Sequence, residues 1–94
     1  EKIIEIIREF LKKDGRDSKA WIFGSFARGD NNIRSDIDLM VRFKDPLKMS
    51  LFDYADISYL LEQQLEIKID LVEEGYLLPF ALRTAKNDLR LIYE

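Results

Sequence analysis

The stretch IFGSFARGDNNIRSDIDLMVRF, from Ile22 to Phe43, places a Gly-Ser pair ten residues ahead of an Asp-x-Asp triplet. The second half of the stretch alternates in polarity, which predicts a β-strand over residues 36–43. One face of that strand is apolar and carries Ile37, Leu39, Val41 and Phe43. The other face carries Asp36 and Asp38, although strands disfavour aspartate. These two carboxylates therefore need a physical explanation.

Helices and strands are predicted to alternate on both sides of this stretch. Apolar residues at helical spacing predict a helix over residues 2–13, and Gly15 is expected to end it. Further strands are predicted at residues 19–23, 67–72 and 89–93, a helical turn at 25–28 that Gly29 closes, and longer helices at 50–65 and 79–87. This order predicts an α/β (α+β) fold in which helices pack on a small sheet.

The helix predicted at residues 50–65 has a broad apolar stripe, which we expect to face the core. The stripe consists of Leu51, Tyr54, Ala55, Ile57, Ser58, Leu61 and Leu65. Four aromatic side chains are likewise expected in the core rather than as platforms for a nucleotide base, because their spacing matches the apolar faces. They are Trp21, Phe23, Tyr54 and Tyr59.

Size and composition limit the kinds of chemistry that the chain can perform. A length of 94 residues suits one hydrophobic core, so residues 1–94 are interpreted as a single domain. With 47% hydrophobic and 35% charged residues, the balance is typical of a globular protein. The sequence contains no cysteine and no histidine, which excludes disulfides, thiolate or imidazole metal ligands, and Ser-His or Cys-His catalytic pairs. Any catalysis must therefore use carboxylates.

Charge and hydropathy limit the partners. The formal net charge is −3 and the isoelectric point is near 5.0, so direct binding to a nucleic-acid backbone is not expected. No apolar run approaches the roughly 20 residues of a membrane span, and the N-terminal residues lack a signal-peptide pattern. We therefore expect no membrane association and a cytoplasmic location.

Asp36 and Asp38 lie two residues apart on one strand, so their carboxylates point the same way, roughly 6–7 Å apart along the backbone. A Mg²⁺ ion, which prefers oxygen ligands, would relieve both their repulsion and their desolvation. If the strand at 67–72 lies beside theirs, Asp70 supplies a third carboxylate, and two Mg²⁺ ions could sit roughly 3.5–4 Å apart for phosphoryl transfer. The simpler interpretation is that each aspartate is a solvated residue at a strand end.

The Gly-Ser pair suggests contact with an anion. Gly24 lets the backbone approach a ligand closely, and Ser25 offers a hydroxyl and N–H groups to a phosphate at the start of a short helix. Ser25 could also be an ordinary N-cap. Arg28 could neutralise phosphate charge or form an ordinary surface ion pair. Gly24, Ser25 and Arg28 are thus the candidates for binding a phosphate group.

In combination, these features resemble the DNA polymerase beta-type nucleotidyltransferase superfamily. GSFARGDNNIRSDIDL matches the pattern of that superfamily without a gap, and KIDLV supplies its later acidic residue, Asp70. The short length and the form GSFARGD resemble the minimal nucleotidyltransferases, small prokaryotic proteins commonly paired with a HEPN-domain partner in toxin–antitoxin modules. The resemblance covers nearly the whole chain.

This resemblance implies a mixed sheet with helices on one side, and it assigns roles to the candidate residues. Asp36, Asp38 and Asp70 would be the catalytic residues and the Mg²⁺ ligands, while Gly24 and Ser25 would contact the nucleoside triphosphate. Asp70 would also help to deprotonate an acceptor hydroxyl, which would attack the α-phosphorus of ATP and expel pyrophosphate. The implied acceptor is a tyrosine of a HEPN toxin, so the chain would be an antitoxin that adenylylates its partner.

Two other functions agree with the same residues. One is a small-molecule nucleotidyltransferase of the aminoglycoside-modifying type, in which a homodimer would supply the missing pocket wall. The other is a non-catalytic antitoxin that masks its partner in a hetero-oligomer, with an acidic site that is vestigial or only senses nucleotide.

Overall fold

The computed structural model describes residues 2–76, 83 and 85–94. In chain order the elements are α1 (Lys2–Asp14), β1 (Asp17–Phe23), α2 (Ser25–Arg28), β2 (Ile37–Phe43), the 3₁₀ turn η1 (Pro46–Lys48), α3 (Leu51–Leu65), β3 (Ile69–Glu73) and β4 (Arg90–Tyr93). The predicted alternation is confirmed, although β1 begins earlier and β3 later than expected and η1 was not predicted. The helix predicted at residues 79–87 lies largely outside the described residues.

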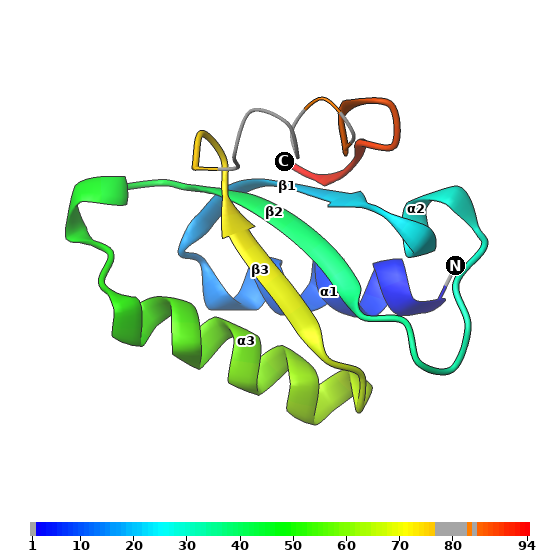
Figure 1. Ribbon diagram of the computed structural model, residues 1–94. Coiled ribbons are helices and arrows are strands. Elements are labelled where there is room, and N and C mark those ends of the chain that lie inside the picture. The colour runs from blue at the N-terminus through cyan, green and yellow to red at the C-terminus, as the bar shows by residue number, and fades with distance from the viewer. Residues whose placement is uncertain (1, 77–82, 84) are drawn as a thin grey trace.

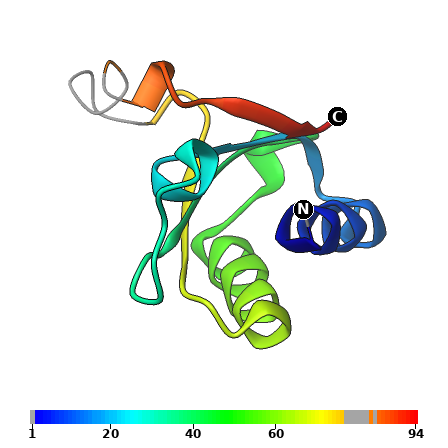
Figure 2. The same cartoon turned by 90° about the vertical axis from the view of Figure 1, so that its right-hand side faces the viewer.

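Four strands form one mixed sheet in the order β3-β2-β1-β4. β1 pairs antiparallel with β2 and β4, whereas β2 and β3 are parallel and are connected through α3. Such a crossover is needed because parallel neighbours cannot be joined by a tight turn. α1 and α3 lie together on one face of the sheet (Figures 1 and 2). The mixed sheet with helices on one side, which the resemblance implied, is therefore confirmed.

The core lies between the sheet and these two helices. The predicted apolar face of β2, from Ile37 to Phe43, is at most 2% exposed. It packs against Ile4, Ile7 and Leu11 of α1 and Ile57 and Leu61 of α3. Each buried side chain of this size contributes about 1.5–3 kcal/mol. This burial determines which face of β2 turns away from the helices, and hence the direction in which Asp38 points.

Local signals fix the ends of the helices. Gly15 follows α1 with a φ of 78°, and its N–H donates to the carbonyl of Leu11 at 3.0 Å. Ser50 caps α3, because its N–H donates to the Asp53 carboxylate at 2.8 Å in a capping box. Within the described part of the chain, no helix combines the length and the apolar character that crossing a membrane requires.

Several side chains that were predicted to be buried lie at the surface. Leu51 is 84% exposed, Tyr59 is 60% exposed and Ala55 is also exposed, because only one side of α3 contacts the sheet and α1. Trp21 and Phe23 are half-buried on the sheet face opposite the helices, since they alternate with the buried Ala20 and Ile22. Tyr54 agrees with the prediction, since its ring packs edge-on against Phe43 at 5.2 Å.

Candidate active site

β2 and β3 bring two of the predicted carboxylates side by side. In the parallel register Asp38 lies opposite Asp70. Both side chains point away from the helical layer, because the alternating residues Ile37 and Ile69 are buried on the other face. Asp38 is half-buried and Asp70 is exposed. The strand at 67–72 therefore does lie next to the strand of Asp38, as the third carboxylate requires.

Asp36 lies one residue before β2 and is exposed. The N–H of Ile37 donates to the carbonyl of Lys68 at 2.9 Å, which ties this end of β2 to the segment before β3. Asp36 thus stands at the point where the pairing of β2 with β3 begins, near enough to Asp38 to act on it electrostatically.

The three carboxylates influence one another electrostatically. Burial raises the pKa of Asp38, and the negative charges of Asp70 and Asp36 raise it further. A hard divalent cation fits this set of oxygen donors, since its charge would offset the repulsion. Among residues 2–76, 83 and 85–94, however, no three or more acidic, histidine or cysteine side chains are arranged so that they could hold a metal ion. The assignment of Asp36, Asp38 and Asp70 as metal ligands therefore stays a prediction.

Gly24 lies directly against the Asp38 carboxylate. A Cβ atom at position 24 would stand 2.2 Å from Asp38 Oδ2, which is far inside van der Waals contact. The backbone of Gly24 also has a φ of 73° and a ψ of −153°, a conformation that side chains disfavour. This close approach, which the sequence suggested for a ligand, is made to a catalytic candidate of the same chain.

α2 begins directly after Gly24. The N-cap position is occupied by Gly24 itself, and Ser25 is the first residue of the helix, so the alternative in which Ser25 is an ordinary N-cap is wrong. Gly29 closes the turn in a left-handed conformation, as predicted, and its N–H donates to the carbonyl of Ser25 at 2.9 Å. The turn thereby holds Ser25 next to the glycine that touches Asp38.

Arg28 forms two ion pairs at the end of α2. Its Nε donates to Asp30 at 3.1 Å and its Nη1 donates to Asp88 at 2.9 Å. The positive charge of Arg28 also acts to lower the pKa of Asp38, against the larger effects that raise it. Sequence reasoning missed Asp88, because no pattern connects two residues that far apart in the chain.

A cavity of about 650 Å³ opens beside Asp36, between the segments 31–36 and 66–68. Ile3 and Phe26 give it apolar wall area, while Arg34 and Lys68 add positive charge. Its volume is within the range of small-ligand sites. One of the three carboxylates therefore adjoins a hollow that could receive part of a ligand.

Comparison with known proteins agrees with this geometry. The family model for the nucleotidyltransferase domain matches residues 3–92, and the chain belongs to this family. A candidate protein adenylyltransferase of Methanocaldococcus jannaschii is 33% identical over 91 residues, which is 93% of this chain and 91% of that protein. The resemblance to nucleotidyltransferases inferred from GSFARGDNNIRSDIDL is thereby confirmed.

Two solved structures share the fold. A toxin–antitoxin crystal structure with AMP-PNP has a TM-score of 0.79 and 19% identity, covering 95% of this chain and 71% of that chain. The second is the structure of a tri-AMPylated Shewanella oneidensis HEPN toxin in complex with MNT antitoxin. One chain of that structure matches this chain with a TM-score of 0.71 and 16% identity, covering 96% of this chain and 68% of that chain. At these identities the comparison establishes the fold.

Proposed function

We propose that this chain is a metal-dependent protein adenylyltransferase that transfers AMP from ATP to a hydroxyl of a partner protein. The observation that carries the proposal is the pairing of Asp38 with Asp70, with Gly24 against the Asp38 carboxylate. Membership of the nucleotidyltransferase family and the identity to a candidate protein adenylyltransferase support it.

The metal would be held by Asp36, Asp38 and Asp70, and two Mg²⁺ ions are proposed. When bound, Mg²⁺ supplies positive charge that offsets the charge of the triphosphate and of the carboxylates. Burial raises the pKa of Asp38, and the negative charges of Asp70 and Asp36 raise it further; a bound Mg²⁺ would offset this repulsion.

Residues around the carboxylates would bind the triphosphate. The backbone of Gly24 lies against the Asp38 carboxylate, and Ser25 offers its hydroxyl and N–H groups at the start of α2. Arg28 would contribute positive charge to the phosphates, in addition to its ion pairs with Asp30 and Asp88. These three residues extend the site from β2 along the turn that follows β1.

The proposed reaction is an in-line displacement at the α-phosphorus. Asp70, the more exposed member of the pair, accepts the proton of the acceptor hydroxyl. The hydroxyl oxygen then forms a bond to the α-phosphorus, while the bond from that phosphorus to the oxygen bridging to the β-phosphate breaks. Pyrophosphate leaves, and AMP remains on the acceptor as a phosphodiester.

The proposed acceptor is a tyrosine of a HEPN-domain toxin, so that the chain acts as an antitoxin. The complex of an AMPylated HEPN toxin with an MNT antitoxin supports this choice, because the antitoxin fold is shared. A partner that is itself a folded protein would also complete a site that lies open on the sheet surface.

Mass spectrometry of a HEPN-domain protein from the same organism tests the proposal. That protein is incubated with this chain, ATP and MgCl₂, and we expect a gain of adenylate mass on a tyrosine. The double variant Asp36→Asn/Asp38→Asn should give no detectable gain, whereas Asp45→Asn, an exposed aspartate outside the cluster, should transfer normally. Chelation with EDTA should abolish transfer, and excess Mg²⁺ should restore it.

Equal transfer by the double variant would refute the assignment of the carboxylates. A stable complex with no adenylate on either protein would point instead to an antitoxin that masks its partner. Transfer to an aminoglycoside by the chain alone would favour the small-molecule alternative.

A further inference from the structure

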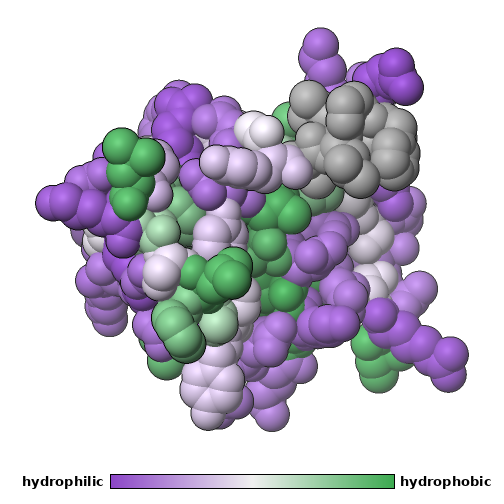
Figure 3. Space-filling model, turned by 60° about the vertical axis from the view of Figure 1, so that its left-hand side comes forward, coloured by the Kyte–Doolittle hydropathy of each residue, from purple (hydrophilic) through white to green (hydrophobic). Residues whose placement is uncertain are grey.

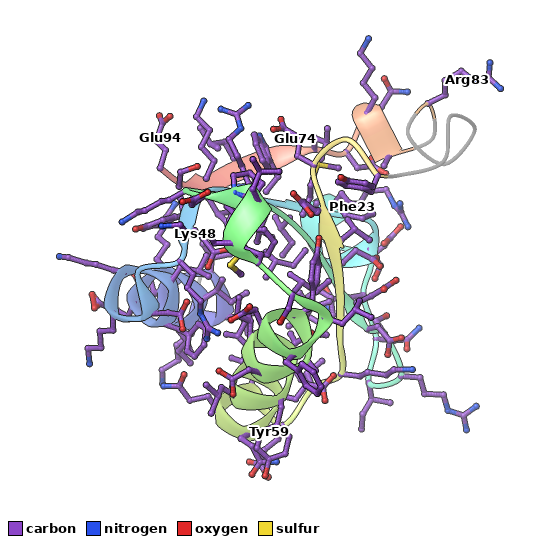
Figure 4. The ribbon with its side chains drawn as sticks, turned by 90° about the vertical axis from the view of Figure 1, so that its left-hand side faces the viewer. Phe23, Lys48, Tyr59, Glu74, Arg83 and Glu94 are labelled. Carbon is purple, nitrogen blue, oxygen red and sulfur yellow. The ribbon has the colours of Figure 1, made fainter. Side chains whose placement is uncertain are left out.

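The outer side of α3 and the turn before it carry large apolar side chains that face solvent. We call this region the α3 outer surface and define it by Leu47, Leu51, Phe52, Ala55 and Tyr59. Leu47 is 97%, Leu51 84%, Phe52 87% and Tyr59 60% exposed. Figure 3 shows hydrophobic side chains gathered on the side of the molecule that carries η1 and the start of α3. In Figure 4 Tyr59 lies on the outer side of α3, far from Phe23, the strand residue opposite Asp38.

This exposure has a pattern. Single exposed apolar residues are ordinary, but Phe52, Ala55 and Tyr59 recur at the spacing that places residues on one stripe of a helix. The opposite stripe of α3 is already used, since Ile57 and Leu61 are fully buried in the core. A surface helix normally has a polar outer face, so a helix that is apolar on both sides indicates a second packing partner.

The charge of the α3 outer surface favours a partner other than a second copy of this chain. The charged residues of α3 are Asp53, Asp56 and Glu62, and its sequence contains no lysine or arginine. Asp56 remains half exposed beside Phe52 and Tyr59 although it also accepts a hydrogen bond from Arg16. Arg16 pairs with Asp53 and Asp56, but it is shared with a third carboxylate, that of Asp14, so this group keeps a net negative charge. In a two-fold pairing of this surface with itself, two such negative groups would be brought together. A partner with basic side chains around an apolar centre is complementary instead.

The position of this surface suits a protein substrate. α3 lies on the helical side of the sheet (Figure 2). Asp38 and Asp70 face the other side, because the alternating residues just before them on β2 and β3 are buried under the helices. The two sides meet at β3, the edge strand that α3 contacts and that carries Asp70. A protein held on α3 could therefore extend a segment around this edge to the carboxylates without covering the nucleotide.

From these observations we infer that the α3 outer surface is the docking site for the acceptor protein, which binds through apolar side chains surrounded by lysine or arginine. This inference rests on the proposed function. Docking would be separate from the chemistry, so that substitutions on α3 should weaken binding of the acceptor protein while leaving nucleotide binding unchanged.

The test compares two matched charge substitutions. Phe52→Asp lies on the docking surface, in the first turn of α3, where aspartate is compatible with a helix. Leu91→Asp is the control, because Leu91 is 42% exposed but lies on β4, the edge strand at the other end of the sheet from β3. Binding of a HEPN-domain protein from the same organism is measured by calorimetry. We expect Phe52→Asp to raise Kd by about tenfold or more and Leu91→Asp to change it by less than about twofold.

Two further measurements distinguish a loss of docking from a loss of folding and from a change in self-association. Binding of AMP-PNP with Mg²⁺ should be the same for Phe52→Asp and the unsubstituted chain, which verifies an intact fold. Sedimentation of the chain alone should give the same monomer mass for both. A dimer that Phe52→Asp dissociates would identify a second copy as the occupant and overturn the inference.

The outcomes also separate this inference from the proposed function. If Phe52→Asp and Leu91→Asp bind the HEPN-domain protein equally well, docking on α3 is wrong even where AMP is transferred. If binding depends on Phe52 but no AMP is transferred, docking stands and the proposed function fails. The variant Asp36→Asn/Asp38→Asn should bind the partner normally, and absence of any binding by the unsubstituted chain would overturn the inference.

Discussion

At Gly24 the backbone lies directly against the carboxylate of Asp38, which we propose to be catalytic. Any side chain there would begin 2.2 Å from Asp38 Oδ2, and the φ of 73° adds backbone strain of about 1–3 kcal/mol. We therefore expect Gly24→Ala to displace Asp38 and to lower the single-turnover rate of AMP transfer by about 100-fold, because misplacement by about 1 Å can have that effect. The rate is measured by quenched flow and the stability by thermal unfolding.

Gly29→Ala separates the loss of space from the strain. Gly29 also has a positive φ, 84°, but nothing lies within 4 Å of the position where its Cβ would stand. It should lose a similar amount of stability and keep a transfer rate within about threefold of the unsubstituted chain. If both variants lost activity equally, the contact with Asp38 would not be what makes Gly24 necessary.

The sequence was sufficient to predict that position 24 needs a glycine next to a functional group, because a Gly-Ser turn after a strand is a local signal. The contact itself could not be predicted. It depends on how the end of β1 lies against β2, and that arrangement is set by the pairing of Phe23 with Asp38. The need for a glycine at position 24 could thus be predicted from the sequence, but its contact with Asp38 could not.

Between elements, one ion pair connects α2 to the residues that precede β4. Arg28 Nη1 lies 2.9 Å from Asp88, and this contact restrains the guanidinium that we assign to the phosphates. Asp88→Asn should raise the KM for ATP by about two- to fivefold with little change in kcat, since a partly exposed pair contributes only about 0.2–1 kcal/mol. Steady-state kinetics of AMP transfer measure both constants.

Glu74→Gln is the matched control for this ion pair. Glu74 accepts from Arg42 at 2.6 Å, and the side chain of Arg42 is 46% exposed, as is that of Arg28. Arg42 stands over the ring of Trp21, 5.7 Å from its centre, and lies four residues beyond Asp38 along β2. The KM for ATP should not change. A rise equal to that of Asp88→Asn would mean that loss of any surface pair weakens the protein generally.

The buried face was predicted well for a strand with one apolar face, but not for a helix with apolar residues on two sides. The alternation in β2 gave the buried face and the direction of Asp38, because one side of that strand meets the core. For α3 the same rule failed at Leu51 and Tyr59, since hydrophobicity does not distinguish the core from the exposed surface that we propose for docking. The order of the strands was also beyond the local pattern, because it depends on pairing between distant segments.

The stability of the whole molecule should depend on a carboxyl group that takes no part in the site. Asp17, at the start of β1, is fully buried, and neither of its carboxylate oxygens has a hydrogen-bond partner among the described residues. Burial and the negative charge of Asp14 raise its pKa to about 7, while Arg16 and Lys44 act in the opposite direction. An aspartate beside charged residues is ordinarily assigned to the surface, so its burial could not be predicted from the sequence.

The protonated form of Asp17 is therefore favoured in the folded state. Since its pKa of about 7 in the folded state lies above its ordinary value of 3.8, the contribution to stability is complete below pH 3.8 and is lost as the pH rises to about 7. At one pKa unit per 1.36 kcal/mol, the loss of stability is at most about 4 kcal/mol.

Urea unfolding from pH 4 to pH 8 measures this loss. The free energy of unfolding relative to Asp17→Asn should decrease over this range and level off above pH 7. Asp45→Asn, at an exposed position, should run parallel to the unsubstituted chain. If the curve of Asp17→Asn were parallel as well, Asp17 would be ionised in the folded protein, and its carboxylate would need a cationic partner within the fold.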